Sequence, residues 1–293
     1  MNKRKLRVII AIDGGGIRGI FPLLILAHIN SLLKKHKLSD NLNNSIDLIA
    51  GTSTGAIISA GLIVKKSDTN LYSLEELLGL YELRGPQLFN LANPGHEKSE
   101  GLRLVLKRKF KDILLSDLDV HFTFVSYDTI SKSPYVFERN KKDLSSLLLS
   151  TALAACSAIP GYFSPVEIGE SNLVDGIMVA KNPSEIAYNY AKKYFPDDLY
   201  LLLSFGTGLL KDSMHDDIEK EVNRVEEHLT EKSIKDKDLM YFRFQPDIKT
   251  ADPKMDNATP QNIAALIQDG KSYIKENSAY FESLIESWKE HQN

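Results

Sequence analysis

The chain has 293 residues, of which 43% are hydrophobic and 26% charged, and its net charge is −3. A chain of this length can bury a sizeable core in one large α/β domain, and its charge balance argues against a nucleic-acid partner. The lone cysteine, Cys156, allows no intramolecular disulfide, and no Cys/His cluster has zinc spacing.

The N-terminus begins like a signal peptide, because basic residues occupy positions 3–5 and 7. The apolar run that follows, residues 8–12, is too short for a signal sequence, and no small-residue cleavage site comes after it. No later stretch approaches the roughly 20 apolar residues of a membrane-spanning helix. We therefore expect a cytoplasmic protein that can touch a membrane surface.

The first third of the chain alternates between strands and helices. The apolar, β-branched residues 8–12 predict a buried strand, and the spacing of apolar residues predicts a helix over 17–36. Residues 46–50 predict a second strand, and residues 55–64 a buried helix. Because strand, turn and helix follow one another twice, the order predicts a parallel sheet covered by helices.

Two helices, over 74–84 and 102–110, are predicted next. Between them, residues 85–95 have the Gly and Pro content of a loop, and this loop carries the apolar residues Leu88, Phe89 and Leu91. These apolar residues either cover a site or touch lipid, or else they pack on the core.

The middle of the chain continues with two strand patterns, over 122–127 and 134–137, which we expect to pair. Residues 144–158 predict a helix that ends before Pro160. A short apolar pair, Leu173 and Val174, then leads into Asp175 and Gly176.

The last part contains one more predicted strand, over 199–205, after a helix that Pro183 opens. Residues 211–238 carry many charges of both signs and predict a solvated helical excursion. Pro260 opens a further helix, and the remainder is amphipathic. We expect a single domain over 1–293, with a core at about 7–208 and a helical C-terminal part at about 209–293.

The sequence GTSTG at 51–55 fits the pattern G-x-S-x-G, with Ser53 at its centre. A nucleophilic serine has to project from a sharp turn between a strand and a helix, and glycines two residues away relieve the crowding there. The pattern is common by chance, but here it falls between a predicted strand and a predicted helix. We therefore interpret Ser53 as a nucleophile.

The glycines Gly14, Gly16 and Gly19 fit G-x-G-x-x-G, which allows two interpretations. One is a Rossmann turn that binds a dinucleotide, although the acidic residue expected about 20 positions later is missing. The other is a nest of backbone N–H groups that binds an oxyanion. Arg18 would add positive charge for a phosphate headgroup, or it is an ordinary surface or paired arginine.

Histidines offer no evident catalytic partner. A triad of Ser53, Asp175 and either His215 or His228 is formally available in the order of an α/β-hydrolase. For each histidine, however, the better interpretation is that its side chain is exposed or packed and takes no part in catalysis. Cys156 lies inside an apolar helical run, which indicates a buried, unreactive thiol.

The ordered set of motifs, DGGGIRG at 13–19, GTSTG at 51–55 and DG at 175–176, resembles the patatin-like phospholipase family. Segments at 155–160, 182–183, 204–208 and 255–256 are similar to the family too. The resemblance implies a three-layer α/β sandwich with a mostly parallel central sheet. One departure is Ile177, which stands where the family usually has Gly or Ala.

The same resemblance implies the roles of individual residues. Ser53 corresponds to the nucleophile and Asp175 to its partner in a Ser–Asp dyad, while Gly14, Gly15 and Gly16 correspond to the oxyanion loop. The implied activity is hydrolysis of fatty-acyl esters of phospholipids or lysophospholipids without a cofactor. We also expect transient contact with a membrane surface, and restraint by a regulatory partner, an effector or self-assembly. The alternatives are a nucleotide-dependent oxidoreductase and a non-catalytic binding or storage protein.

Overall fold

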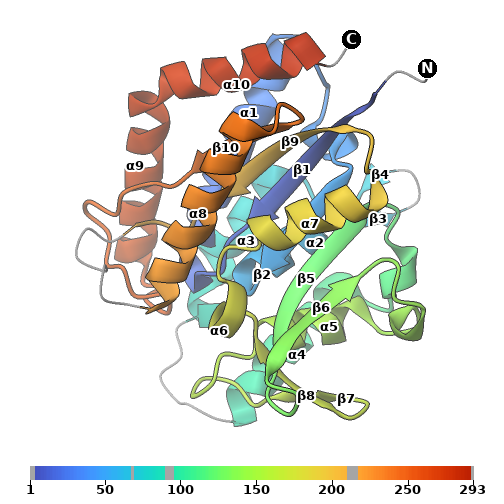
Figure 1. Cartoon of the computed structure of the whole chain (residues 1–293). Coiled ribbons are helices and arrows are strands. Elements are labelled where there is room, and N and C mark those ends of the chain that lie inside the picture. The colour runs from blue at the N-terminus through green and yellow to red at the C-terminus, as the bar shows by residue number, and fades with distance from the viewer. Residues whose placement is uncertain (1–3, 67–68, 90–95, 210–216, 292–293) are drawn as a thin grey trace.

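The computed structural model describes residues 4–66, 69–89, 96–209 and 217–291 (Figure 1). Within them, eight strands form one sheet in the order β10-β9-β1-β2-β5-β8-β7, and β6 pairs with β5. The strands of this sheet are β1 (Leu6–Ile12), β2 (Leu48–Thr52), β5 (His121–Asp128), β6 (Ser133–Glu138), β7 (Val166–Ile168), β8 (Ser171–Asp175), β9 (Leu199–Phe205) and β10 (Leu239–Phe244). A separate two-stranded sheet consists of β3 (Lys65–Lys66) and β4 (Thr69–Asn70).

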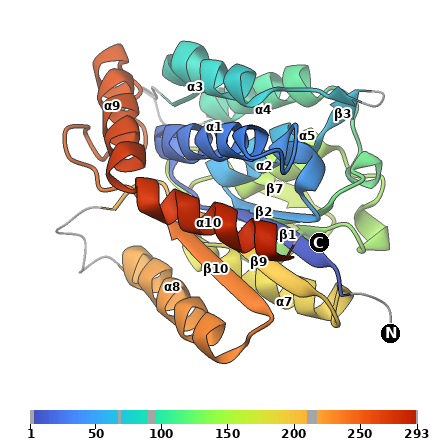
Figure 2. The same cartoon turned by 90° about the horizontal axis from the view of Figure 1, so that it is seen from above.

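Helices cover both faces of the large sheet (Figure 2). They are α1 (Ile20–Lys35), α2 (Thr54–Ile63), α3 (Leu74–Phe89), α4 (His96–Phe110), α5 (Leu149–Cys156), α6 (Ile177–Ala180), α7 (Ser184–Tyr194), α8 (Asp217–Lys235), α9 (Pro260–Glu276) and α10 (Ser278–His291). Short 3₁₀ turns lie at Gly16–Gly19, Leu42–Ser45, Leu115–Asp117 and Lys142–Leu144. Seen from above, α7 and α8 lie on one face, whereas α1, α2, α9 and α10 lie on the other, with α3 and α4 outside them. The predicted three-layer α/β architecture is confirmed.

The five strands from β10 to β5 run parallel, and the pairs β5–β6, β5–β8 and β8–β7 are antiparallel. Parallel strands buried on both faces need apolar residues throughout, and all five residues of β2 are buried. The carboxyl ends of β1 and β2 meet at one edge of the sheet, where α/β proteins place their sites. Thr52 pairs with Val125 and Ser126 pairs with Asp175, so this register brings β8 level with the end of β2.

Several boundaries differ from the prediction. Helix α3 continues through Pro86 to Phe89, so the expected loop over 85–95 is wrong for its first five residues. Residues 90–95, which include Leu91, lie outside the described part of the chain. Helix α5 begins only at Leu149, because residues 142–144 form a separate 3₁₀ turn.

The sheet also extends beyond the core predicted at 7–208. Strand β10 pairs with β9 along its whole length, although its sequence LMYFRF and the charged residues before it gave no clear strand pattern. Helix α8 is not a solvated excursion, because one side of it is buried, and Val225 and Leu229 on this side pack against the sheet. The C-terminal part of the chain therefore supplies a strand of the central sheet and a helix of one covering layer.

The helical segment Gly16–Lys35 is long and apolar enough, by length and composition, to span a membrane. The prediction that no stretch approaches this length is therefore wrong. In the fold, 83% of the relevant window is buried inside the protein. Apolar residues all around this helix are explained by its position, since the sheet covers one side and α3, α9 and α10 contact the others.

A buried ion pair joins the end of β1 to β10. The Arg243 guanidinium donates to both carboxylate oxygens of Asp13, at 2.9 and 2.6 Å, and also to Ser204 Oγ at 2.8 Å. Burial raises the pKa of Asp13 and Arg243 lowers it, whereas Asp13 raises the pKa of Arg243. The two short hydrogen bonds support the ionised pair. This pair explains why a charged residue occurs among buried residues near the end of β10.

Replacing Arg243 by Met should destabilise the protein by roughly 3–5 kcal/mol, because it leaves the Asp13 carboxylate buried without its partner. The double variant Arg243→Met with Asp13→Asn should recover part of this loss. Urea unfolding of the three proteins measures both effects. Equal stability of Arg243→Met and the unsubstituted chain would contradict the importance of the pair.

Candidate active site

Ser53 occupies the turn between β2 and α2. β2 ends at Thr52 and α2 begins at Thr54, so Ser53 alone turns the chain, with φ of 56° and ψ of −125°. A non-glycine residue in such a conformation costs about 1–3 kcal/mol, and it persists only where the surrounding structure imposes it. The serine of the predicted motif thus lies on a strained strand–turn–helix connection.

The two glycines of the motif permit this turn. A Cβ atom on Gly51 would lie 2.5 Å from the backbone of Ala56. A Cβ atom on Gly55 would lie 2.1 Å from the carbonyl oxygen of Ile12, at the end of the neighbouring strand. Any side chain at either position would therefore push α2 away from the sheet and displace Ser53.

Asp175 lies directly against Ser53. The hydroxyl of Ser53 donates to Asp175 Oδ2 at 2.6 Å, and the amide of Ile177 donates to Asp175 Oδ1 at 2.8 Å. The amide of Asp175 itself donates to the carbonyl of Ala158 at 3.0 Å. Ser53 is only 4% exposed and Asp175 is fully buried. The structure therefore brings together the two residues that the sequence predicts as a dyad.

Burial raises the pKa of Asp175 to about 7, because the carboxylate loses hydration that the protein replaces only in part. The hydrogen bonds from Ser53 and from the amide of Ile177 act in the opposite direction and favour the ionised form. A carboxyl group with a pKa near neutrality can both take up and return a proton at ordinary pH. Such a perturbed group beside a serine in a cavity is typical of a functional site.

The glycine turn at 14–16 packs next to Ser53. The amide of Gly14 donates to the carbonyl of Lys181 at 3.0 Å. In the part of the chain that the structure describes, the amides of Gly15 and Gly16 meet no acceptor. The predicted oxyanion loop thus retains two available donors, whereas the Gly14 amide is already engaged.

The same turn leaves no room for a dinucleotide. A Cβ atom on Gly15 would lie 2.2 Å from Thr207 Oγ1, and one on Gly16 would lie 2.2 Å from the carbonyl oxygen of Met255. Protein atoms therefore fill the space through which a pyrophosphate would approach the backbone of a Rossmann turn. This packing disfavours the nucleotide-binding interpretation.

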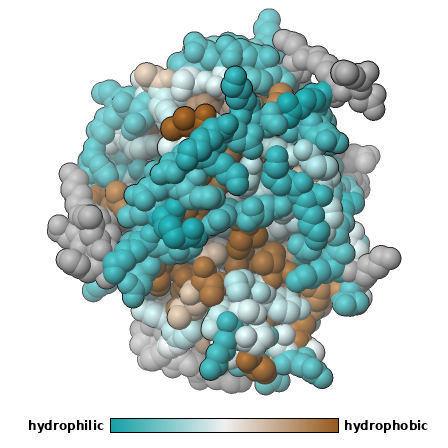
Figure 3. All heavy atoms as spheres, viewed as in Figure 1, coloured by the Kyte–Doolittle hydropathy of each residue, from teal (hydrophilic) through white to brown (hydrophobic). Residues whose placement is uncertain are grey.

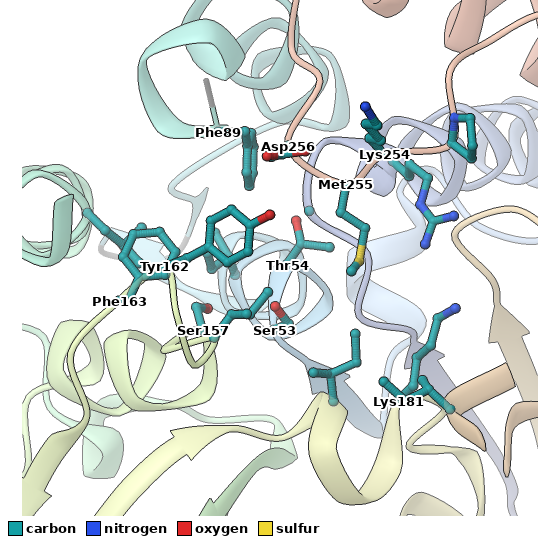
Figure 4. Close-up of a pocket in the computed structure, with 18 of the residues that line it drawn as sticks. Ser53, Thr54, Phe89, Ser157, Tyr162, Phe163, Lys181, Lys254, Met255 and Asp256 are labelled. Atoms are coloured by element: carbon teal, nitrogen blue, oxygen red, sulfur yellow. The ribbon is translucent and has the colours of Figure 1, made fainter. Parts of the chain in front are cut away.

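Ser53 opens into a cavity of about 520 Å³ (Figure 4). One side of the cavity is apolar, and Figure 4 shows Phe89, Tyr162 and Phe163 on this side of Ser53. Ile57 and Leu102 line the cavity as well and, together with Phe89, they also line a smaller apolar gap among α2, α3 and α4. Of the predicted cover residues, Phe89 therefore belongs to the cavity wall, while the side chain of Leu88 lies outside the described residues.

The other side of the cavity is charged. Arg18, Lys181 and Glu219 line it, and all three are almost fully buried. Lys181 Nζ forms an ion pair with Glu219 Oε1. Burial lowers the pKa of Arg18 and of Lys181, and Glu219 raises both. The structure therefore places Arg18 in the cavity wall rather than on the surface.

Sequence reasoning missed Lys181, Glu219 and Ile177 as cavity residues. Lys181 directly precedes the family-like pair Asn182-Pro183, which was the available signal, whereas Glu219 was one of many charges in a segment predicted to be solvated. Ile177, the departure from the family pattern, lines the cavity with its side chain and binds Asp175 through its amide. The departure thus leaves the position of Asp175 intact.

Histidines with described side chains do not line the cavity. His28 stacks edge-on against Phe281, His121 contacts Tyr190 and Phe195, and His228 lies 3.8 Å from Glu185. His215 lies outside the described residues. Cys156 is fully buried, and burial raises the pKa of its thiol, as expected for an unreactive core residue.

Within the described residues, no three His, Cys, Asp or Glu side chains lie close enough together to hold a metal ion. The charged side chains at the cavity alternate in sign instead, with Glu219 next to two cations.

Comparison with known proteins gives matches along most of the chain. The profile of the patatin-like phospholipase family matches residues 10–188, more than half of the chain. Patatin-like protein 2 of Oryza sativa is 30% identical over 220 residues, which cover 66% of this chain and 54% of the relative. Patatin group M-2 of Solanum tuberosum is 24% identical over 328 residues, which cover 92% of this chain and 84% of the relative. The chain thus spans about half the length of the rice relative.

Among solved structures, human GIVD cytosolic phospholipase A2 has a similar fold, with a TM-score of 0.53 at 11% sequence identity. The likeness covers 97% of this chain and 60% of the human protein. The family profile includes the glycine turn, Ser53 and Asp175 in one continuous match. This chain belongs to the patatin-like phospholipase family.

Proposed function

We propose that this protein is a serine acyl-hydrolase that cleaves fatty-acyl esters of phospholipids or lysophospholipids. The observation that carries the proposal is the 2.6 Å hydrogen bond between Ser53 Oγ and Asp175, at the base of a cavity with one apolar and one cationic side. An apolar side suits an acyl chain, and a cationic side suits a phosphate headgroup. Membership of the patatin-like phospholipase family supports the same reaction class.

In the proposed reaction, Asp175 takes the proton of Ser53 as its oxygen attacks the ester carbonyl carbon. The carbonyl π electrons move onto oxygen, and the amides of Gly15 and Gly16 stabilise this oxyanion, by roughly 3–4 kcal/mol per well-placed donor. When the carbon–oxygen bond to the leaving alcohol breaks, Asp175 returns the proton to that alcohol. Water then attacks the acyl-enzyme with Asp175 again as base, which releases the fatty acid and restores Ser53.

The surface near the cavity supports brief contact with a membrane. Tyr162, which lines the cavity, is 38% exposed, Met178 in α6 is 51% exposed and Leu104 in α4 is 49% exposed. In Figure 3 the face covered by α7 and α8 is largely hydrophilic, and hydrophobic residues gather below it, around the position of α6 in Figure 1. Exposed apolar side chains near a cavity entrance can insert between lipids and bring an ester to Ser53.

Ser53→Ala and Asp175→Asn should each lower the release of fatty acid from phospholipid by roughly 10³-fold or more, since each removes a group that acts in the transition state. A fluorophosphonate probe should label the unsubstituted protein and fail to label Ser53→Ala. Ser157 lines the same cavity, so Ser157→Ala is the matched control and should still be labelled. Robust hydrolysis by either dyad variant would contradict the dyad, and absence of labelling would favour a non-catalytic binding protein.

Asp175→Asn should stabilise the fold at high pH. The pKa of Asp175 is raised from 3.8 to about 7, so ionising it costs folding free energy that is absent below pH 3.8 and fully present above about 7. A shift of this size corresponds to roughly 4 kcal/mol as an upper bound. Urea unfolding at pH 8 should therefore show the variant to be more stable by a few kcal/mol, with a smaller gain at pH 5. An equal gain at both pH values would contradict the raised pKa.

Leu102→Trp should shorten the preferred acyl chain, because Leu102 lines both the cavity and the apolar gap next to it. Loss of burial for two methylene groups costs about 1.6 kcal/mol, or about 15-fold in kcat/KM. The measurement is the ratio of kcat/KM for hexadecanoyl and butanoyl p-nitrophenyl esters. Leu83→Trp, on the exposed side of α3, is the matched control. If both variants leave the ratio unchanged, the acyl chain lies elsewhere.

A further inference from the structure

The cavity wall next to Ser53 contains three buried ionisable side chains whose charges do not cancel. Arg18 is 3% exposed, Lys181 is 2% exposed and Glu219 is 6% exposed. One carboxylate therefore faces two cations. Behind them, Arg243 pairs with the buried Asp13, and it also lies 3.5 Å from the partly exposed Glu226. The buried set keeps one excess positive charge at the wall of the cavity.

The remaining charged residues of the cavity wall do not supply the missing negative charge. Lys254 and Asp256 lie further out, where both are more exposed, and they carry opposite signs. Figure 4 shows them together with Met255, away from Lys181. The excess charge thus belongs to the inner pair of cations.

Arg18 has no anionic partner of its own among the residues that the structure describes. Among the described residues, no carboxylate, carbonyl or hydroxyl accepts a hydrogen bond from its guanidinium, and its buried Nε has no acceptor. Glu219 and Asp13 act on Arg18 only through space. A buried guanidinium normally has a hydrogen-bonded anion, because burial without one costs its hydration. The wall beside Ser53 is therefore suited to an anionic ligand.

Lys181 is held by an ion pair that is itself incomplete. Its ammonium contacts Glu219 Oε1, whereas Glu219 Oε2 is buried and has no partner. Glu219 comes from the first turn of α8 and Lys181 follows α6, so the pair links two separate elements. A ligand anion that bound both Lys181 and Arg18 would satisfy two cations, whereas Glu219 satisfies one.

We propose that Lys181 and Arg18 together bind the phosphate of the lipid headgroup, and that Glu219 competes with this phosphate for Lys181. The inference rests on the proposed function, since it concerns the same cavity. A phosphodiester carries one negative charge, which brings the buried set to neutrality. The phosphate would lie opposite Phe89, Tyr162 and Phe163, so headgroup and acyl chain would extend to different sides of Ser53 (Figure 4). Glu219 would then set how strongly the enzyme prefers phospholipids to neutral glycerides.

Two substitutions with opposite expected effects test the proposal. The measurement is the ratio of kcat/KM for a lysophospholipid and for a monoacylglycerol with the same acyl chain. Lys181→Met should lower this ratio about tenfold, because it removes a charged hydrogen-bond donor. Glu219→Gln should raise it about tenfold, because Lys181 no longer has a competing carboxylate. Lys192→Met, which removes a lysine on the surface of α7, should leave the ratio unchanged.

Inorganic phosphate provides a readout that does not depend on hydrolysis. Thermal unfolding with increasing phosphate should show stabilisation that is stronger in Glu219→Gln and weaker in Lys181→Met than in the unsubstituted protein. Lys181→Arg keeps the charge and should preserve both the ratio and the phosphate effect, which separates charge from folding defects. These outcomes remain measurable even if the proposed ester hydrolysis fails.

Three results would overturn the proposal. The first is a ratio that stays the same in Lys181→Met and Glu219→Gln while both proteins still hydrolyse esters. The second is a change of the ratio in the same direction in both variants. The third is phosphate stabilisation that depends on Lys181 without any change in the ratio, since this would indicate a site for free phosphate rather than for a lipid headgroup.

Discussion

A hydrogen bond between Ser53, which opens into the cavity, and the fully buried Asp175 is the interaction on which the proposed chemistry depends. The two residues are 122 positions apart in the sequence. Their contact requires β2, β5 and β8 in the register observed, and it requires that water be kept from the carboxylate. Because that exclusion raises the pKa of Asp175 to about 7, the feature that would make Asp175 a useful base also reduces the stability of the fold.

The cavity around this bond is built from segments of different origin. Helices α2, α3 and α4 supply Ile57, Phe89 and Leu102 on the apolar side, whereas the glycine turn, α6 and α8 bring the charged residues. Ser53 lies between the two sides because the carboxyl ends of the parallel strands meet at this edge of the sheet. An ester with an apolar chain and an anionic headgroup matches this division. The proposed competition between Glu219 and phosphate for Lys181 would set how strongly the cavity prefers such an ester to a neutral one.

Steric crowding around the Ser53 turn explains why the sequence motif was informative. Gly51 and Gly55 have backbone neighbours at distances that no side chain tolerates, so the spacing G-x-S-x-G follows directly from the geometry. In contrast, Arg243 and Glu219 had no such local signature. Glu219 is one of many charges in α8, and Arg243 is a single charge in the strand LMYFRF. Each is buried because a partner from a distant segment, Lys181 or Asp13, lies opposite.

The sequence by itself determined the central parallel strands, the helices that follow them, the position of Ser53 in a sharp turn and the family resemblance that singled out Asp175. These features depend on apolar periodicity, on glycine and on ordered motifs, which are local properties of the chain. Only the tertiary structure decided that β10 completes the sheet, that the Gly14 amide is engaged by Lys181, and that Arg18, Lys181 and Glu219 share one cavity wall. Burial and pairing of charges depend on residues far apart in the chain, and no local pattern of residues records them.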